Sequence, residues 1–176
     1  MTAAGGDEVE RVLAERARLL ARPLPEAPSG RLDQLAVLLA GGERYAVDLA
    51  SVDRVHPVAA VTPLPGLRPP WAGLVALRGE LLPALDVPAY LGRASLPGPG
   101  GGPAAAYCAV VAHGGLRVAL LSDQAVTLMP RPVGGLSGPL APVPAPAGAV
   151  VGVTGDLVTI LDVASILADP ALLVDD

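Results

Sequence analysis

The chain has 176 residues, a mass of 17.6 kDa and 52% hydrophobic residues, which is enough for one domain or for two small units that share a core. Its formal net charge is -5, and all 12 of its basic residues are arginines. This balance excludes the strongly basic surface that a nucleic-acid-binding protein needs. A single cysteine, Cys108, excludes an internal disulfide and fits a reducing cytoplasm.

The N-terminal part of the chain differs in pattern from the remainder. Residues 7–21 predict a helix, with Asp7 as N-cap and Glu10 completing a capping box. Prolines in residues 22–30 predict an extended linker. We therefore expect residues 1–30 to form a helical extension with a Pro-rich linker, and residues 31–176 to form the main domain.

The sequence shows no segment suited to a membrane. The first ten residues lack the basic and apolar regions of a secretory signal. The uncharged stretch at residues 132–155 contains several prolines and glycines, which exclude a spanning helix. We expect a cytoplasmic protein that does not insert into a membrane.

From residue 32 onward, short apolar runs alternate with turn signals, a pattern typical of small β-sandwiches or barrels. Short helices are expected at residues 87–91 and 163–167, each after an aspartate cap, and loops at residues 92–103 and 130–148. The expected strands are residues 34–40, 44–49, 56–62, 73–77, 81–85, 105–112, 116–122, 149–153 and 157–161.

The β-region contains an internal duplication. Its first hairpin at residues 38–47 matches residues 110–120, and residues 73–87 match residues 149–163 at a nearly constant offset. Gly79 falls on Gly155 in this alignment. Two hairpins and an aspartate-capped helix, present twice, predict two similar small barrels.

The sequence predicts no active site, metal site or cofactor site. His56 and His113 lack a cysteine or carboxylate at metal-ligand spacing. Ser122, which precedes an aspartate, is not in a nucleophile elbow, and its expected role is structural. The glycine-rich residues 97–103 lack the Lys-Ser/Thr pair of a phosphate-binding loop.

Two side chains are candidates for a binding role. Trp71 is the only tryptophan, and it either plugs a barrel mouth or contacts a partner. Arg78 lies at a tight hairpin turn beside Gly79, where an arginine serves either as a solubilising charge or as a rigidly mounted contact.

The region around Arg78 resembles the signature segment of CheW-type coupling proteins of bacterial chemotaxis. The pattern G-x-x-x-L-R-G-x-x-x-P-x-x-D runs from Gly73 to Asp86, and the similarity extends through residues 43–55, 118–126 and 152–162. The resemblance implies a mainly β fold of two SH3-like five-stranded barrels, at about residues 33–92 and 104–168, with an N-terminal helix and a short C-terminal helix.

The same resemblance implies a non-catalytic adaptor of a two-component system. Members of the family bridge the regulatory domain of the histidine kinase CheA to the cytoplasmic tips of methyl-accepting chemotaxis receptors. Arg78 matches the family's turn arginine, which is implicated in receptor binding. A helical turn at residues 51–55 and the strand at residues 74–77 match the groove that receives the receptor. The expected receptor-binding residues are Val52, Arg54, Val55, Ala76, Leu77 and Arg78.

The sequence departs from the family pattern near this groove. Ala76 stands where the family usually has asparagine, and Arg54 stands where an acidic residue is common. Residues 122–125 and 86–88 also differ from the family's segments. A reversed charge at a rim changes the choice of partner. These departures leave open a CheW-like component of a non-chemotactic array, such as one for pilus motility, and, from a different class, a small ligand-binding barrel or enzyme.

Overall fold

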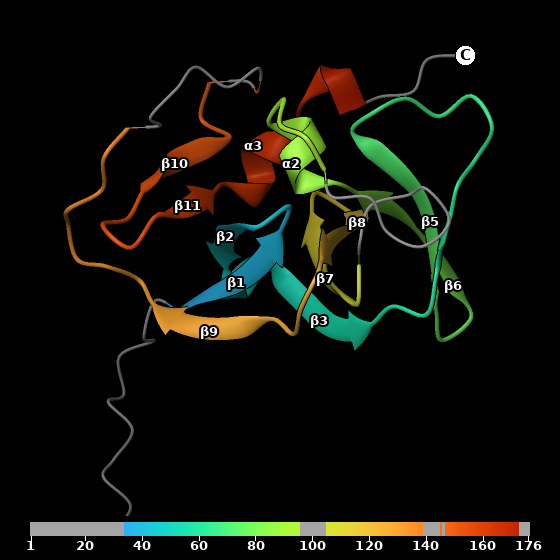
Figure 1. Ribbon diagram of the computed structural model, residues 1–176, viewed down its shortest axis with the longest axis horizontal. Helices are drawn as coiled ribbons and strands as arrows, with labels where there is room; N and C mark the ends of the chain where they lie inside the picture. The colour runs from blue at the N-terminus through green and yellow to red at the C-terminus, as the bar shows by residue number, and fades with distance from the viewer. Residues whose placement is uncertain (1–33, 96–104, 139–144, 146, 173–176) are drawn as a thin grey trace, which may run out of the picture. The chain divides into compact units, whose positions relative to one another are not determined.

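The computed structural model describes residues 34–95, 105–138, 145 and 147–172, and within them the chain is mainly β, as predicted (Figure 1). The helix and linker expected at residues 7–21 and 22–30 lie outside the described residues. The strands are β1 (Gln34–Ala40), β2 (Glu43–Asp48), β3 (Val52–Pro57), β4 (Val61–Thr62), β5 (Trp71–Leu77), β6 (Glu80–Leu85), β7 (Tyr107–His113), β8 (Leu116–Ser122), β9 (Thr127–Pro130), β10 (Val150–Val153) and β11 (Val158–Leu161). The helices are α2 (Val87–Tyr90) and α3 (Val163–Leu167), with 3-10 turns η1 (Leu49–Ser51) and η2 (Pro170–Leu172).

The strands form two sheets. Sheet A has five strands in the order β10-β11-β2-β1-β9, and sheet B has six in the order β3-β7-β8-β6-β5-β4. The two orders correspond under the internal duplication, because β1, β2, β10 and β11 match β7, β8, β5 and β6. Each sheet also contains one parallel pair, β11 with β2 and β6 with β8.

The two sequence repeats exchange hairpins. The β1–β2 hairpin pairs with β9 and β11 of the second repeat, whereas the β7–β8 hairpin pairs with β3 and β6 of the first. Residues 33–92 and residues 104–168 therefore each contribute strands to both sheets. Neither sheet is built from one of the two segments that the sequence suggested as barrels.

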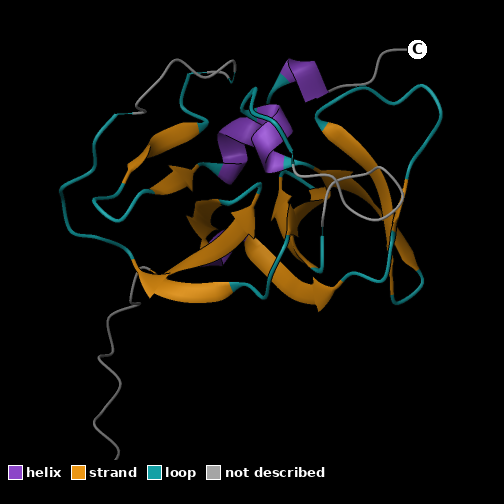
Figure 2. Ribbon diagram, viewed as in Figure 1, coloured by secondary structure: helices purple, strands orange, loops and turns teal. Residues whose placement is uncertain are grey.

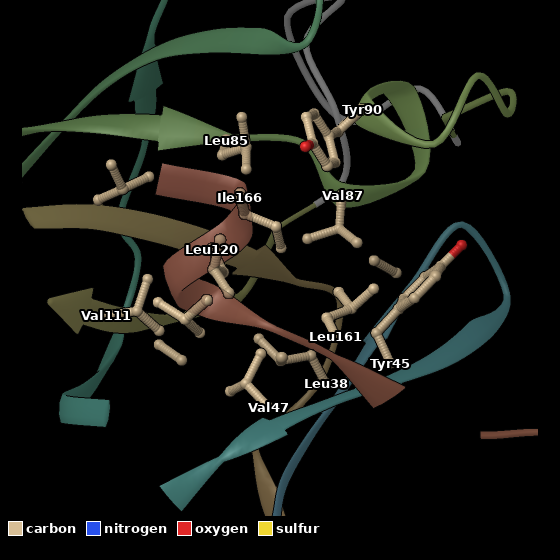
Figure 3. Close-up of a cluster of buried hydrophobic side chains, with 14 of the residues drawn as sticks. Leu38, Tyr45, Val47, Leu85, Val87, Tyr90, Val111, Leu120, Leu161 and Ile166 are labelled. Carbon is tan, nitrogen blue, oxygen red and sulfur yellow. The ribbon is translucent and has the colours of Figure 1, made fainter. Parts of the chain in front are cut away.

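Alternation along the strands buries both faces of the central hairpins. We call cluster A the buried residues Leu35, Val37, Ala46, Val158 and Ile160, which come from sheet A alone. Cluster B comes from sheet B alone and comprises Val75, Leu77, Leu82, Ala84, Cys108, Val110, Ala119 and Leu121. The intervening residues of both sheets, such as Leu38, Val111 and Leu120, form a shared core (Figure 3).

Helices α2 and α3 complete the shared core (Figure 2). Both begin after an aspartate, as predicted: the Asp86 carboxylate accepts the backbone N–H of Ala89 at 3.2 Å, and Asp162 accepts that of Ser165 at 2.9 Å. Such short helices are marginal alone, so burial of side chains such as Val87 and Ile166 stabilises them.

The structure corrects two local predictions. The helical turn expected at residues 51–55 is wrong: the 3-10 turn ends at Ser51, and Val52 begins β3, which pairs with β7. The strand expected at residues 56–62 is divided, because its first residues complete β3 and its last two form β4. Strand β9, which the sequence analysis did not predict, supplies the partner on the free side of β1.

We predict that the two sheets unfold together, because each sheet needs hairpins from both repeats and buries one face of its central strands in the shared core. Replacement of Leu120, which is 0% exposed, by alanine should lower the free energy of unfolding by about 3 kcal/mol. Leu128→Ala, at a residue that is 59% exposed, is the control and should change it by less than about 0.5 kcal/mol. Urea unfolding followed by Trp71 fluorescence and by far-UV circular dichroism should give coincident transitions. Two separate transitions would contradict the prediction.

We also predict a pH-dependent contribution from the cap of α3. The Ser165 hydroxyl donates to Asp162 Oδ2 at 2.6 Å and lowers the pKa of that carboxyl below its usual value. The stabilisation is present above the unfolded-state pKa and is lost as the pH falls through the folded-state pKa. Ser165→Ala should therefore lower the melting temperature at neutral pH, and the difference from wild type should disappear in strong acid. A difference of the same size at both pH values would rule out this linkage.

Candidate functional site

The turn between β5 and β6 holds an arginine in a conformation that favours glycine. Three hairpins have two-residue turns in which both residues have positive φ. The β1–β2 and β7–β8 turns use two glycines, whereas the β5–β6 turn uses Arg78, with a φ of 49°, and Gly79. An L-residue in this left-handed region costs roughly 1–2 kcal/mol. Backbone strain of this kind is concentrated at functional sites. Of the two described residues other than glycine that have positive φ, Arg78 and Leu157, Arg78 carries a charge, which makes it the candidate contact residue.

The Arg78 side chain is available to a partner. The residue is exposed, and its guanidinium makes no ion pair or hydrogen bond with any residue that the structure describes. Two paired strands hold the turn from both sides, with Leu77 opposite Glu80 as the last pair in the register. The charge is therefore mounted on a rigid hairpin tip.

A closed ring of four charged side chains lies next to this turn. Arg54 Nη2 donates to Glu80 Oε2 at 2.8 Å, and Arg54 Nε lies 3.2 Å from Asp53 Oδ2. Arg117 Nη2 donates to Asp53 Oδ2 at 2.6 Å, and Arg117 Nη1 donates to the other oxygen of Glu80. We call these four residues the charged ring; its two positive and two negative charges cancel.

The charged ring ties three strands of sheet B together. Arg54 lies opposite Val110 in the β3–β7 register, and Glu80 lies opposite Leu77, so both charged residues share a strand face with members of cluster B. Arg117 joins them from β8. The side chains are 29% to 47% exposed, so each pair contributes about 0.2–1 kcal/mol.

An apolar row runs along the opposite face of the β5–β6 hairpin. Leu74 lies opposite Pro83, and Ala76 lies opposite Leu81, which is 65% exposed. At its inner end the row enters a groove of about 290 Å³. The groove is lined mainly by Leu64, Leu67, Trp71, Leu74, Pro83 and Leu116.

Trp71 has both a structural and a surface role. It packs against the shared core, its Nε1 donates to the carbonyl oxygen of Leu172 at 3.2 Å, and its ring lines the apolar groove. The expected role as a core plug therefore accounts for its contact with the shared core but not for its place in the groove.

The structure separates the residues that the sequence analysis placed in one groove. Val52 packs against the shared core, Leu77 is 5% exposed inside cluster B, and Val55 is 42% exposed on β3. These three therefore do not line a common groove. Arg54 and the Arg78 turn are brought together instead, through Glu80.

Exposed Leu81 and the Leu74–Pro83 pair were missed by the sequence analysis. A signal for them exists in the sequence: a two-residue turn at Arg78–Gly79 fixes the hairpin register, and this register places Ala76 opposite Leu81.

Ser122, Asp123 and Cys108 could carry chemistry by residue type, but the structure gives them structural positions. Ser122 is buried, and its hydroxyl accepts the backbone N–H of Leu39 at 3.1 Å, which links β8 to β1. The Asp123 carboxylate accepts the N–H of Gly41 at 3.1 Å, and burial raises its pKa. Burial also raises the pKa of the Cys108 thiol, so this cysteine is a weak nucleophile.

Among the described residues, no three histidine, cysteine, aspartate or glutamate side chains are grouped so as to hold a metal ion. No helix in this part of the chain combines the length and the apolar character that are needed to cross a membrane.

Comparison with known proteins identifies the fold. The model of the CheW-like domain family matches residues 34–171. The crystal structure of the scaffolding protein TtCheW from Thermoanaerobacter tengcongensis is similar, with a TM-score of 0.60, 20% sequence identity, and coverage of 78% of this chain and 94% of that chain. At this identity the structural match supports the fold alone. Among curated proteins, none matches the sequence.

The strained turn leads to a prediction about stability. Because Arg78→Gly relieves the left-handed strain and removes no described contact, we expect the free energy of unfolding to stay unchanged or to rise by up to about 1 kcal/mol. Gly79→Ala, at a φ of 85°, is the opposite control and should lower it by about 1 kcal/mol. Urea denaturation measures both. A clear loss of stability in Arg78→Gly would show that the arginine side chain serves the fold.

Proposed function

Because the chain belongs to the CheW-like domain family, we propose that it is a non-catalytic adaptor that couples chemoreceptors to a CheA-type histidine kinase. Its place would be in the cytoplasm, at the periphery of receptor arrays. The family match over residues 34–171 supports the adaptor role. The observation that carries the site is Arg78, exposed and strained on a rigid turn.

The surface around Arg78 suits a helical partner. The exposed residues Ala76 and Leu81 lie opposite each other next to the turn, at the outer end of the apolar row. A helix that packs apolar side chains on this row can place an acidic side chain against the Arg78 guanidinium. Such a contact uses apolar burial for affinity and charge for orientation.

We assign two roles to the receptor-site residues expected from the sequence: some contact the receptor, and others support the site from beneath. Val55, Ala76 and Arg78 are exposed and are proposed to contact the receptor tip. Val52 and Leu77 are proposed to support the site from the shared core and from cluster B. Arg54 is proposed to act through Glu80.

Arg54 also favours a second candidate function. This arginine bonds to Glu80 of its own chain, and the Ala76 side chain has no amide that could bond to a partner. A site altered in this way suits a CheW-like component of a non-chemotactic array, such as one for pilus motility, in which receptor binding differs. Binding to a CheA-type kinase without binding to receptor tips would favour this second candidate.

The proposal predicts a selective effect of reversing one charge. Arg78→Glu should weaken binding to nanodiscs that carry receptor signalling tips by at least about tenfold, because it places a carboxylate where the partner's acid binds. Arg44→Glu, the same change at an exposed arginine of sheet A, should keep wild-type binding. Co-sedimentation measures binding, and thermal melting checks that both variants fold. Equal loss of binding in the two variants would contradict the assignment of the site to Arg78.

A further inference from the structure

The charged ring gives Glu80 an unusual position. Its two carboxylate oxygens accept hydrogen bonds from two different arginines, Arg54 on β3 and Arg117 on β8. Glu80 is also the first residue of β6, immediately after the Arg78–Gly79 turn. One carboxylate therefore bridges two guanidinium groups and lies at the base of the turn.

The geometry argues against Arg54 as a direct contact. Its Nη2 bonds to Glu80 at 2.8 Å, and its buried Nε, which has no hydrogen-bond partner, lies 3.2 Å from Asp53 Oδ2. A partner's acid would compete with Glu80 and Asp53 for this guanidinium. Arg78, two residues before Glu80, has no such internal acid among the described residues.

The net charge of the ring and the charge of Arg78 determine the electrostatic potential that a partner encounters at this hairpin tip. The charged ring is neutral, so the uncompensated charge at this hairpin tip is that of Arg78. Without Glu80, Arg54 and Arg117 would share the single carboxylate of Asp53, and the tip would gain a positive charge. Glu80 thus controls how many acidic groups this surface attracts.

We propose that Glu80 is a specificity-determining residue. It is the internal counter-ion that holds Arg54 and Arg117. The surface therefore selects a helical segment in which apolar side chains surround one acidic group, and this acidic group pairs with Arg78. The inference rests on the proposed function and names the chemistry of its partner. Arg54 is then a positioning residue that acts through Glu80.

A charge swap tests the proposal. Arg54→Glu and Glu80→Arg each break the ring and place like charges together, so the base of the Arg78 turn loses the ion pairs that hold it. Each should therefore weaken binding to a soluble receptor signalling-tip fragment by about tenfold, although Glu80→Arg adds positive charge to the surface. The double variant R54E/E80R restores an ion pair and the net charge, and its binding should return to within about threefold of wild type. Fluorescence anisotropy measures the dissociation constants, and circular dichroism checks the fold of every variant.

The outcomes separate the possible failures. Rescue in the double variant supports the proposal. If the single variants bind as wild type does, or the double variant stays weak while folded, the proposal is overturned and the adaptor function stands. If wild type itself does not bind the fragment, the proposed function fails and the proposal with it.

A second variant keeps the test decisive if the charge-reversed chains do not fold. Glu80→Gln keeps the shape of the side chain and removes its charge, and Arg78→Gln is its counterpart at the turn. Binding should depend more steeply on NaCl concentration in E80Q than in wild type, and less steeply in R78Q. An unchanged salt dependence in E80Q would overturn the proposal.

Discussion

The shared core between the two sheets is the constraint on which the rest of the structure depends. Each repeat gives one hairpin to each sheet, so strands such as β1 and β8 bury one face in their own sheet's cluster and the other in the common core. Neither sheet can form its full strand order without both repeats. The short helices α2 and α3 are stable because their apolar side chains are buried in this core.

The rigidity of this core is what allows the surface to carry a strained, charged turn. The β5–β6 hairpin pairs with β8, whose residues fill both the shared core and cluster B. On such a base the chain can hold Arg78 at positive φ and still keep the hairpin register. The charged ring adds a second, polar restraint at the same end of the hairpin, through Glu80. The strained backbone and the charge of Arg78, which is unpaired among the described residues, thus lie together with the apolar row of the β5–β6 hairpin at one hairpin tip.

The turns and helix starts could be predicted from local sequence, whereas the pairing of strands that are distant in sequence could not. The turn at Arg78–Gly79 and the helix starts after Asp86 and Asp162 could be predicted because they depend mainly on neighbouring residues. The duplication identified equivalent strands, but equivalence does not determine which hairpin pairs with which, so the exchange went unpredicted. The Arg54–Glu80 pair escaped for the same reason, since no local pattern brings β3 to the start of β6.

The most direct test of the adaptor account is the autophosphorylation rate of a CheA-type kinase, measured with and without receptor nanodiscs and with and without this chain. The account predicts that the three components sediment together and that the chain raises the kinase rate only when receptors are present. A chain that joins neither receptor nor kinase, and leaves the rate unchanged, would contradict it.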